Sequence, residues 1–432
     1  MKVKTIVVLA LALTVSHLAN AQSGTNSPYS QYGLGYLSEQ TSGFNRGMNG
    51  LALGFREHNQ VNHLNPASYS SVDSLSFIFD IGVSGQLTNF TENNQKINAN
   101  NADLEYIVAG FRAFRHVGVS FGLIPITNVG YNYSTTNRVG GIGTTTYTNT
   151  YTGSGGLHEA YLGIGWEPLK GFSFGVNVGY LWGDFDRSVV NEYSDNTTNT
   201  VSKAYSASVS SYKVDLGVQY TARLSKQNSL TLGATYSLGH NLGADPTCTV
   251  SSTNAQTQVT ETETFTVKDG LELPSSFAVG LLWNHSNRWK IGLDYSLQKW
   301  AKTQFPIYST TGGVSTYALA DNQFDDRHKI TFGGEYCPKE YGRKFFQRMR
   351  YRAGVSYATP YLKINGLDGP KEMSVSMGLG IPIVNGYNNR SILNLGVQYA
   401  RMDAAQLIKE NTFRICVGIT FNERWFAKWK VE

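Results

Sequence analysis

The sequence is poor in charge, proline and cysteine, and after its first 21 residues it has no long apolar run. Charged residues make up 16% of the 432 positions, against about 25% in soluble domains, and there are only 11 prolines. No later stretch approaches the length of a membrane helix, about 18–20 apolar residues, so a polytopic helical membrane protein is excluded. The composition also argues against a coiled coil, a helical bundle and a charged disordered chain.

The cysteines and the net charge exclude further classes. Cys248, Cys337 and Cys416 lie far apart without C-x-x-C or metal-ligand spacing, so we expect one incidental disulfide or none. The formal net charge of +5 is too small an excess to indicate nucleic-acid binding.

Residues 1–21 have the three regions of a secretory signal peptide. Lys2 and Lys4 give a positive start, residues 6–15 are apolar, and Ala19-Asn20-Ala21 is a small-x-small cleavage site. A buried N-terminal helix is the alternative interpretation. No cysteine stands at the cleavage site, which argues against a lipoprotein, and we leave residues 1–21 out of the fold argument.

The rest of the chain has many glycines and tyrosines, 45 and 26 in all, and it alternates apolar with small or polar side chains. The clearest case is the apolar face formed by Tyr212, Val214, Leu216, Val218 and Tyr220. Alternating segments of about ten residues separated by turns are typical of transmembrane β-barrels. We predict an all-β fold, a transmembrane antiparallel β-barrel of about 14 strands. The expected strands are 75–88, 103–113, 116–134, 150–166, 171–189, 205–221, 229–242, 260–284, 288–302, 327–336, 350–360, 371–382, 391–402 and 412–422.

The predicted connections alternate in length. Those after even-numbered strands are short, such as 115–116, whereas those after odd-numbered strands are long and polar, such as 91–102, 135–150 and 191–203. Short turns are typical of the periplasmic end of an outer-membrane barrel and long loops of the extracellular end. An even number of strands then puts both termini in the periplasm.

The alternation also predicts which charges face the inside of the barrel. Charges on the lipid side would be costly, so we assign the polar face of each strand to the lumen. Opposite charges on this face favour an ion-pair network over a selectivity filter. The predicted lumen residues are Asp80, Lys213, Asp215, Lys290, Asp294, Lys329, Glu335, Arg350, Arg352 and Arg414. A soluble β-sandwich is the alternative fold, but it would not need the difference between short turns and long loops.

Residues 22–73 do not alternate like strands and have too few apolar residues for a domain of their own. Their tyrosines, leucines and phenylalanines favour burial. We therefore predict an N-terminal hatch that fills the barrel, with a flexible periplasmic tail as the alternative. The predicted organisation is signal peptide 1–21, hatch 22–73, barrel 74–422 and a periplasmic C-terminal tail 423–432.

Several short motifs carry a resemblance to a known family. They are Ser27-Pro28-Tyr29-Ser30-Gln31-Tyr32-Gly33-Leu34-Gly35, the run Arg46-Gly47-Met48-Asn49-Gly50, Asn65-Pro66-Ala67-Ser68 just before the first strand, and Arg424-Trp425-Phe426-Ala427-Lys428-Trp429-Lys430. With about 14 strands, the chain resembles the FadL/TodX family of outer-membrane transporters, in the variant of Bacteroidetes. The resemblance covers essentially the whole mature chain.

The resemblance implies a monomeric barrel whose hatch closes the lumen. It further implies that hydrophobic molecules enter from outside and leave sideways into the membrane at a kinked third strand. Pro125 stands in the middle of the third predicted strand, and proline cannot donate to a strand ladder. Pro125 and Asn128 are therefore our candidates for a lateral opening, with Asn65, Pro66 and Ala67 packed against it. A plain structural bulge at Pro125 is the alternative.

The sequence offers no enzymatic constellation. It has no H-E-x-x-H, and its two G-x-S-x-G matches, 118–122 and 171–175, lie inside alternating strands and not at a strand-to-helix turn. We expect no enzyme, no metal and no cofactor.

Two functions stay open at this stage. The first is passive uptake of hydrophobic, long-chain fatty-acid-like molecules across the outer membrane of a Gram-negative bacterium. The second is a non-transporting barrel that acts as a docking, scaffold or shuttle component of a secretion or surface-assembly system, with a protein partner at the periplasmic face. Transport predicts an apolar cavity and a break in pairing at Pro125. Docking predicts an uninterrupted wall and an exposed patch, such as the basic turn 339–352. The loops are rich in Thr and Asn, so no outer capture site is evident.

Overall fold

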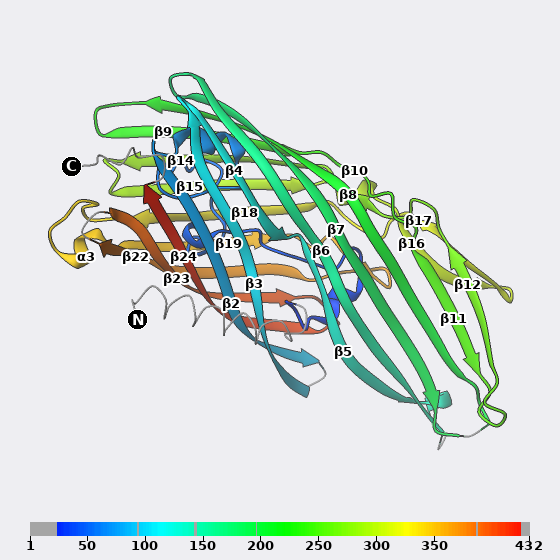
Figure 1. Ribbon diagram of the computed structural model, residues 1–432. Helices are drawn as coiled ribbons and strands as arrows, with labels where there is room; N and C mark the ends of the chain where they lie inside the picture. The colour runs from blue at the N-terminus through cyan, green and yellow to red at the C-terminus, as the bar shows by residue number, and fades with distance from the viewer. Residues whose placement is uncertain (1–23, 93–94, 142–144, 196, 386–387, 425–432) are drawn as a thin grey trace, which may run out of the picture.

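The computed structural model describes residues 24–92, 95–141, 145–195, 197–385 and 388–424 (Figure 1). The predicted signal peptide and residues 425–432 of the predicted tail lie outside this part of the chain. Among the residues described, no helix is both long and apolar enough to cross a membrane.

The described chain forms a closed antiparallel β-barrel of 14 strands. Each wall strand pairs with its sequence neighbour in the wall, and β2 pairs with β24 to close the circle. β4 and β5 are the two halves of the third wall strand. The wall strands are β2 (Ser76–Glu92), β3 (Gln95–Phe114), β4 (Val117–Pro125), β5 (Thr127–Arg138), β6 (Thr146–Leu169), β7 (Phe172–Tyr193), β8 (Thr200–Arg223), β9 (Asn228–Ser237), β14 (Ser276–His285), β15 (Trp289–Gln298), β18 (Arg327–Tyr336), β19 (Arg350–Ala358), β22 (Lys371–Asn385), β23 (Asn388–Asp403) and β24 (Lys409–Arg424).

The outer surface of the wall is apolar, as a lipid-facing barrel requires. Closure pairs the backbone groups of each wall strand with its neighbours, which a strand in lipid needs because no water can satisfy them. Exposed apolar side chains on this surface include Leu162, Val178, Tyr180, Val218, Leu232, Phe332, Val355, Met377, Val397 and Ile415. The prediction of a transmembrane antiparallel barrel is confirmed.

Three predicted loops are wrong over most of their length. β3 begins at Gln95, β5 runs to Arg138 and β6 begins at Thr146, so most of 91–102 and 135–150 is strand. Likewise, most of 191–203 belongs to β7 and β8. The reason is that threonine favours strands, while beyond the lipid both faces of a strand can be polar, so the strand continues without the alternation that marks it in the membrane. The predicted strand 260–284 is also wrong, because 260–266 and 276–285 are separate strands.

The extended strands build a sheet that projects beyond the rest of the barrel. β6 and β8 have 24 residues each, whereas about 9–11 residues cross a bilayer. β11 (Thr247–Thr253) pairs with β8, and β12 (Thr260–Thr266) pairs with β11. Figure 1 shows β5 to β8, β11 and β12 running past the other strands. We call this sheet the projecting sheet, the end that carries it the long-loop end, and the opposite end the short-turn end.

Short elements complete the two ends. The long-loop end carries η3 (Val139–Gly141), β10 (His240–Asn241), β13 (Glu272–Leu273), η4 (Trp300–Lys302), β16 (Phe305–Thr311), β17 (Val314–Ala320), β20 (Lys363–Ile364) and β21 (Leu367–Asp368). The short-turn end carries α3 (Phe345–Arg348) in the connection between β18 and β19.

Residues 24–73 lie against the inner face of the wall, and we call them the hatch. They contain η1 (Pro28–Gln31), β1 (Tyr36–Leu37), α2 (Gly43–Arg46) and η2 (Pro66–Ser71). A small buried cluster joins the hatch to the wall through Leu282 of β14; its hatch members are Phe44, Met48, Leu51 and Phe55.

Glycines on the wall allow the hatch to approach closely. A Cβ on Gly175 would lie 2.4 Å from the carbonyl carbon of Pro66, and one on Gly233 would lie 1.9 Å from the carbonyl oxygen of Leu53. Any larger residue at these two positions would push the hatch away from the wall.

Candidate functional site

The wall is interrupted at the middle of the third wall strand. β4 pairs with β3 from Val117 up to Leu123, which faces Ile107, and the pairing ends there. Beyond this point, the long-loop half of β3 pairs with β2, while β5 pairs with β6 and with β1 of the hatch. The barrel therefore has an interruption of its hydrogen-bonded ladder between β3 and β5, and Pro125 stands next to it.

Two consecutive glycines in β6 allow the backbone of this strand to bend beside the interruption. Gly155 and Gly156 have φ angles of 114° and 136°, a region that other residues rarely adopt. A Cβ on Gly156 would lie 2.3 Å from the carbonyl oxygen of Thr127. The kink at Pro125 is thus built by both strands.

The hatch fills the interruption. Tyr36 and Leu37 of β1 pair with Asn128 and Thr127 of β5. On the β3 side, the Asn26 side chain donates to the carbonyl oxygen of Asn100 at 3.2 Å. The interruption is therefore occupied by residues of the hatch and not by a continuous wall strand.

Further contacts fix the first turn of the hatch above the interruption. Ser27 donates to the Glu410 carboxylate at 2.6 Å, and Tyr29 donates to the carbonyl oxygen of Ile408 at 2.5 Å. The amide of Gly130 in β5 donates to the Ser30 hydroxyl at 3.2 Å.

The structure places the residues predicted for the lateral opening at two different sites. Asn128 lies at the interruption, and its side chain donates to Ser38 at 3.3 Å and to Asp103 at 3.4 Å. Asn65 instead caps η2, accepting from the Ala67 amide at 3.2 Å and donating to the Leu53 carbonyl at 3.0 Å.

Pro66 packs on the glycines of β6, β7 and β8. The triad Asn65, Pro66 and Ala67, at the start of η2, therefore lies against the wall formed by β6, β7 and β8. The hatch segment directly beyond Pro125 is instead β1, which pairs with β5. The triad anchors the hatch to the barrel.

An aromatic cavity of about 290 Å³ opens at the long-loop end. Its walls come from β7, β8, the β16–β17 hairpin and the hatch. The lining is mostly apolar and aromatic, and it includes Tyr32, Leu34, Phe185, Tyr205, Leu271, Phe305, Ile307, Tyr308, Tyr317, Phe324 and Leu362. This cavity could not be predicted from the sequence, because the side chains that line it come from six distant parts of the chain.

Arg187 lines this outer cavity and pairs with no carboxylate among the residues that the structure describes. Its Nη2 donates to the Gly33 carbonyl of the hatch at 2.7 Å, and its Cζ lies 5.5 Å from the centre of the Phe185 ring. Its Nε is buried and has no hydrogen-bond partner in the described part of the chain. A guanidinium in apolar surroundings without a counter-charge is costly, so this position favours an anionic group.

A second cavity of about 240 Å³ lies deeper, between the hatch and the wall. Leu34 lines both the outer and this inner cavity. Ile124, Ile126 and Thr127 line the inner cavity, so it reaches the interruption. Charged side chains also line it, among them Glu159, Lys213, Asp215, Asp294 and Lys329.

The predicted lumen charges lie inside the barrel, and several of them hold the hatch. Asp294 accepts from the amides of Ala52 and Leu53 at 2.7 and 3.0 Å. Lys290 pairs with Glu57 of the hatch, and Arg350 lies 3.4 Å from the same carboxylate.

Other predicted lumen charges bind within the wall. Lys213 pairs with Asp215 at 2.5 Å, and Arg352 pairs with Glu335 at 2.8 Å. Asp80 accepts from Tyr106 at 2.9 Å. Arg414 lies 3.7 Å from Glu39 of the hatch. These groups form a network of ion pairs and hydrogen bonds that fixes the hatch.

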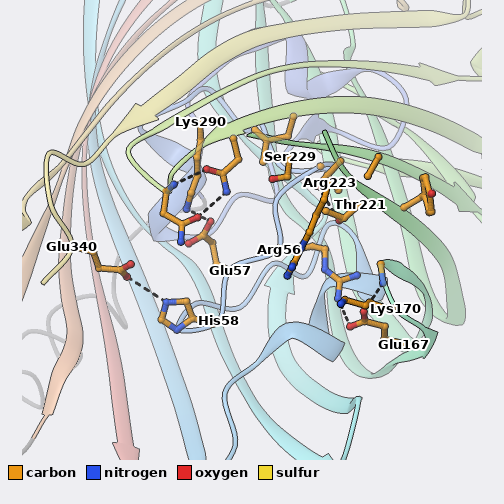
Figure 2. Close-up of a pocket in the computed structure, with 18 of the residues that line it drawn as sticks. Arg56, Glu57, His58, Glu167, Lys170, Thr221, Arg223, Ser229, Lys290 and Glu340 are labelled. Carbon is orange, nitrogen blue, oxygen red and sulfur yellow. Dashed lines mark hydrogen bonds and ion pairs between the residues drawn. The ribbon is translucent and has the colours of Figure 1, made fainter. Parts of the chain in front are cut away.

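A third cavity of about 540 Å³ lies at the short-turn end (Figure 2). The hatch contributes Arg56, Glu57 and His58, and the wall contributes Glu167, Lys170, Arg223, Lys290, Glu340 and Arg350. Figure 2 shows His58 beside Glu340 and Arg56 beside Glu167, with ion pairs of 3.3 and 2.9 Å. Hydrogen bonds to Asp73 and Glu340 raise the pKa of His58 to about 9.

Comparisons with known proteins agree with this architecture. A family model described as BamG matches residues 1–432. The chain belongs to the BamG family. No curated protein sequence matches it.

Solved structures similar to this BamG-family chain include two toluene transporters and a FadL homologue. The Pseudomonas putida toluene transporter TodX is 14% identical, with a TM-score of 0.60 over 91% of this chain and 100% of its own. A Pseudomonas aeruginosa FadL homologue is 10% identical, with a TM-score of 0.63 over 90% and 99%. The Ralstonia pickettii toluene transporter TbuX is 13% identical, with a TM-score of 0.59 over 90% and 99%. The resemblance to the FadL/TodX family is confirmed at the level of the fold, and none of these relatives is described as an enzyme.

Proposed function

We propose that this BamG-family protein is an outer-membrane channel that binds hydrophobic molecules at its outer cavity and releases them sideways into the membrane. The observation that carries the proposal is the interruption between β3 and β5, closed by hatch residues and not by a strand. We assign the long-loop end to the outside of the cell and the short-turn end, with both termini, to the periplasm.

The outer cavity supports the binding of a hydrophobic ligand. Its aromatic and aliphatic lining favours an apolar body, because burial of apolar surface stabilises by about 25 cal/mol per Å². Arg187 favours one anionic group on that body. A long-chain carboxylate combines both features and is the ligand we propose.

The supporting argument for the route is the order of the cavities. The ligand passes Leu34 from the outer to the inner cavity and leaves past Ile126. Straight passage to the periplasm would have to break the ion pairs of Lys290 and Arg350 that hold the hatch. Displacement of β1, which is paired at only two positions, is the smaller change.

The experiment that tests this proposal measures ligand binding to the detergent-purified protein. Dodecanoate and the neutral dodecanol are titrated against wild type, Arg187→Gln and the control Arg138→Gln, which changes an exposed arginine at the end of β5. We expect Arg187→Gln to weaken dodecanoate binding about tenfold or more and to leave dodecanol binding unchanged. Absence of saturable binding of both ligands to the wild type would refute the proposal.

The projecting sheet favours a second candidate function, docking of a protein partner outside the cell. Six strands extend beyond the membrane, and β12 has one paired edge, on β11. A channel needs no such extension. Deletion of 247–266 should leave dodecanoate binding intact if the sheet serves a partner, and should release a protein that otherwise co-purifies with the chain.

A further inference from the structure

The cavity at the short-turn end carries more positive than negative charge. Five of its lining residues are cations and three are carboxylates, and His58 adds a positive charge at neutral pH because its pKa is raised to about 9. The five cations are Arg56, Lys170, Arg223, Lys290 and Arg350. The three carboxylates are Glu57, Glu167 and Glu340.

Each of the three carboxylates already forms an ion pair with one of the five cations. Glu167 pairs with Arg56 at 2.9 Å, and Glu340 pairs with Arg350 at 2.9 Å. Glu57 pairs with Lys290 and lies 3.4 Å from Arg350. Lys170 and Arg223 pair with no carboxylate among the residues that the structure describes, so the excess charge lies on one side of the cavity.

The local fold brings these two cations together. Lys170 lies in the turn between β6 and β7, and the carbonyl of the next residue, Gly171, accepts from the amide of Thr221 at 2.7 Å. Arg223 ends β8 two residues later and faces Ser229 of β9 across the ladder. Figure 2 shows Arg56, Lys170, Arg223 and Ser229 around the same space.

We propose that this cavity binds a phosphate group, held by Arg223 and Lys170 with the Ser229 hydroxyl as a donor. A guanidinium presents paired donors to the oxygens of a phosphate, and an ammonium adds a point charge. The cavity, about 540 Å³, leaves room for a group attached to the phosphate. Inorganic phosphate and the headgroup of an anionic phospholipid share this chemistry. This phosphate site is independent of the outer cavity and of the ligand proposed for it.

The test uses two probes on the full-length purified protein. Inorganic phosphate is titrated by ³¹P line broadening, and phosphatidylglycerol is added in native mass spectrometry. The variant is Lys170→Gln with Arg223→Gln. The matched control is the same double change at Lys226 and Lys268, two exposed lysines outside the cavity. Lys170 and Arg223 are exposed, so the variant should fold, and the heat-induced shift of the barrel in electrophoresis checks this.

We expect the variant to weaken binding about tenfold or more and the control to bind like the wild type. Binding of phosphate alone identifies a free ion as the source, and binding of the lipid alone identifies a headgroup. Equal binding by the folded variant and the control, or no saturable binding of either probe to the wild type, overturns the proposal.

Discussion

The Nη2 atom of Arg187 on β7 donates to the carbonyl oxygen of Gly33 in the hatch at 2.7 Å. The cation that lines the outer cavity is thus tied to the segment that leads into β1. A carboxylate that binds the Nε and Nη2 side of Arg187 with both oxygens would compete with the Gly33 carbonyl for Nη2. Under the proposed function, ligand binding at the outer cavity would weaken the attachment of the hatch three residues before β1 begins.

A disulfide across the interruption should stop transport. Leu37 and Thr127 are directly opposed on β1 and β5, and antiparallel partners have Cα separations that a disulfide can span. We expect oxidised Leu37→Cys with Thr127→Cys to reduce dodecanoate uptake to the background level in cells, and a reductant to restore it. The control is the pair Thr310→Cys with Ser315→Cys on β16 and β17, also directly opposed. Normal uptake by the oxidised Leu37/Thr127 pair would mean that β1 does not move during transport.

Replacing the proline at the kink should favour a continuous wall. Pro125 faces His158 of β6, and valine at this position would add an N–H donor and a side chain that favours strands. We expect Pro125→Val to lower the rate of uptake of a hydrophobic tracer. Pro382→Val, in a wall strand far from the interruption, is the control. Equal rates in both variants and the wild type would refute a lateral exit at this kink.

Removing Arg46 should destabilise the barrel strongly. Its guanidinium pairs with Glu39 at 2.7 Å and with Glu105, and all three side chains are largely buried. Arg46→Ala leaves Glu105 without its ion-pair partner and Glu39 with Arg414 at 3.7 Å, which costs about 3–5 kcal/mol of unfolding free energy. Arg401→Ala breaks an exposed pair with Asp403 and should cost less than about 1 kcal/mol. Urea unfolding in lipid vesicles measures both, and equal losses would contradict the role of Arg46.

The attachment of the hatch at His58 should weaken as the pH rises. Hydrogen bonds to Asp73 and Glu340 raise the pKa of His58 to about 9, above the value of about 6.5 for an unfolded histidine. The stabilisation is therefore complete below about pH 6.5 and is lost as the pH rises through about 9. We expect the difference in melting temperature between wild type and His58→Gln to be largest near pH 6 and to vanish near pH 10. A difference independent of pH would mean that the charge on His58 contributes nothing.

The barrel wall could be predicted because each residue of a membrane-spanning strand faces either the lipid, which requires an apolar side chain, or the lumen. Side chains such as Val218 and Val178 had to face outward, and Lys213 and Asp294 inward, so the alternation alone assigned the lumen charges. The same rule ends at the membrane surface. Beyond it, β6 and β8 continue with polar residues on both faces, so alternation no longer distinguishes strand from loop.

The interruption near Pro125 could be predicted from the sequence because a proline inside a strand is expected only at an edge or a bulge. The outer cavity could not, because Tyr32, Arg187, Tyr308 and Phe324 meet only after the barrel closes. The partners of the lumen charges, such as Glu57, were hidden for the same reason. One local signal was available: Gly155 and Gly156 stand together inside a predicted strand, where glycine often marks a bulge or a close approach.

The seam between β2 and β24 sets an order for assembly. It joins Ser76 to Arg424, so the last contact to form closes a loop that spans nearly the whole barrel. The hatch precedes β2 in the chain and is bonded to strands from β3 to β24. We expect these bonds to guide the growing sheet around the hatch, so that the segment which we propose to move aside for a ligand also serves as the core around which the wall forms.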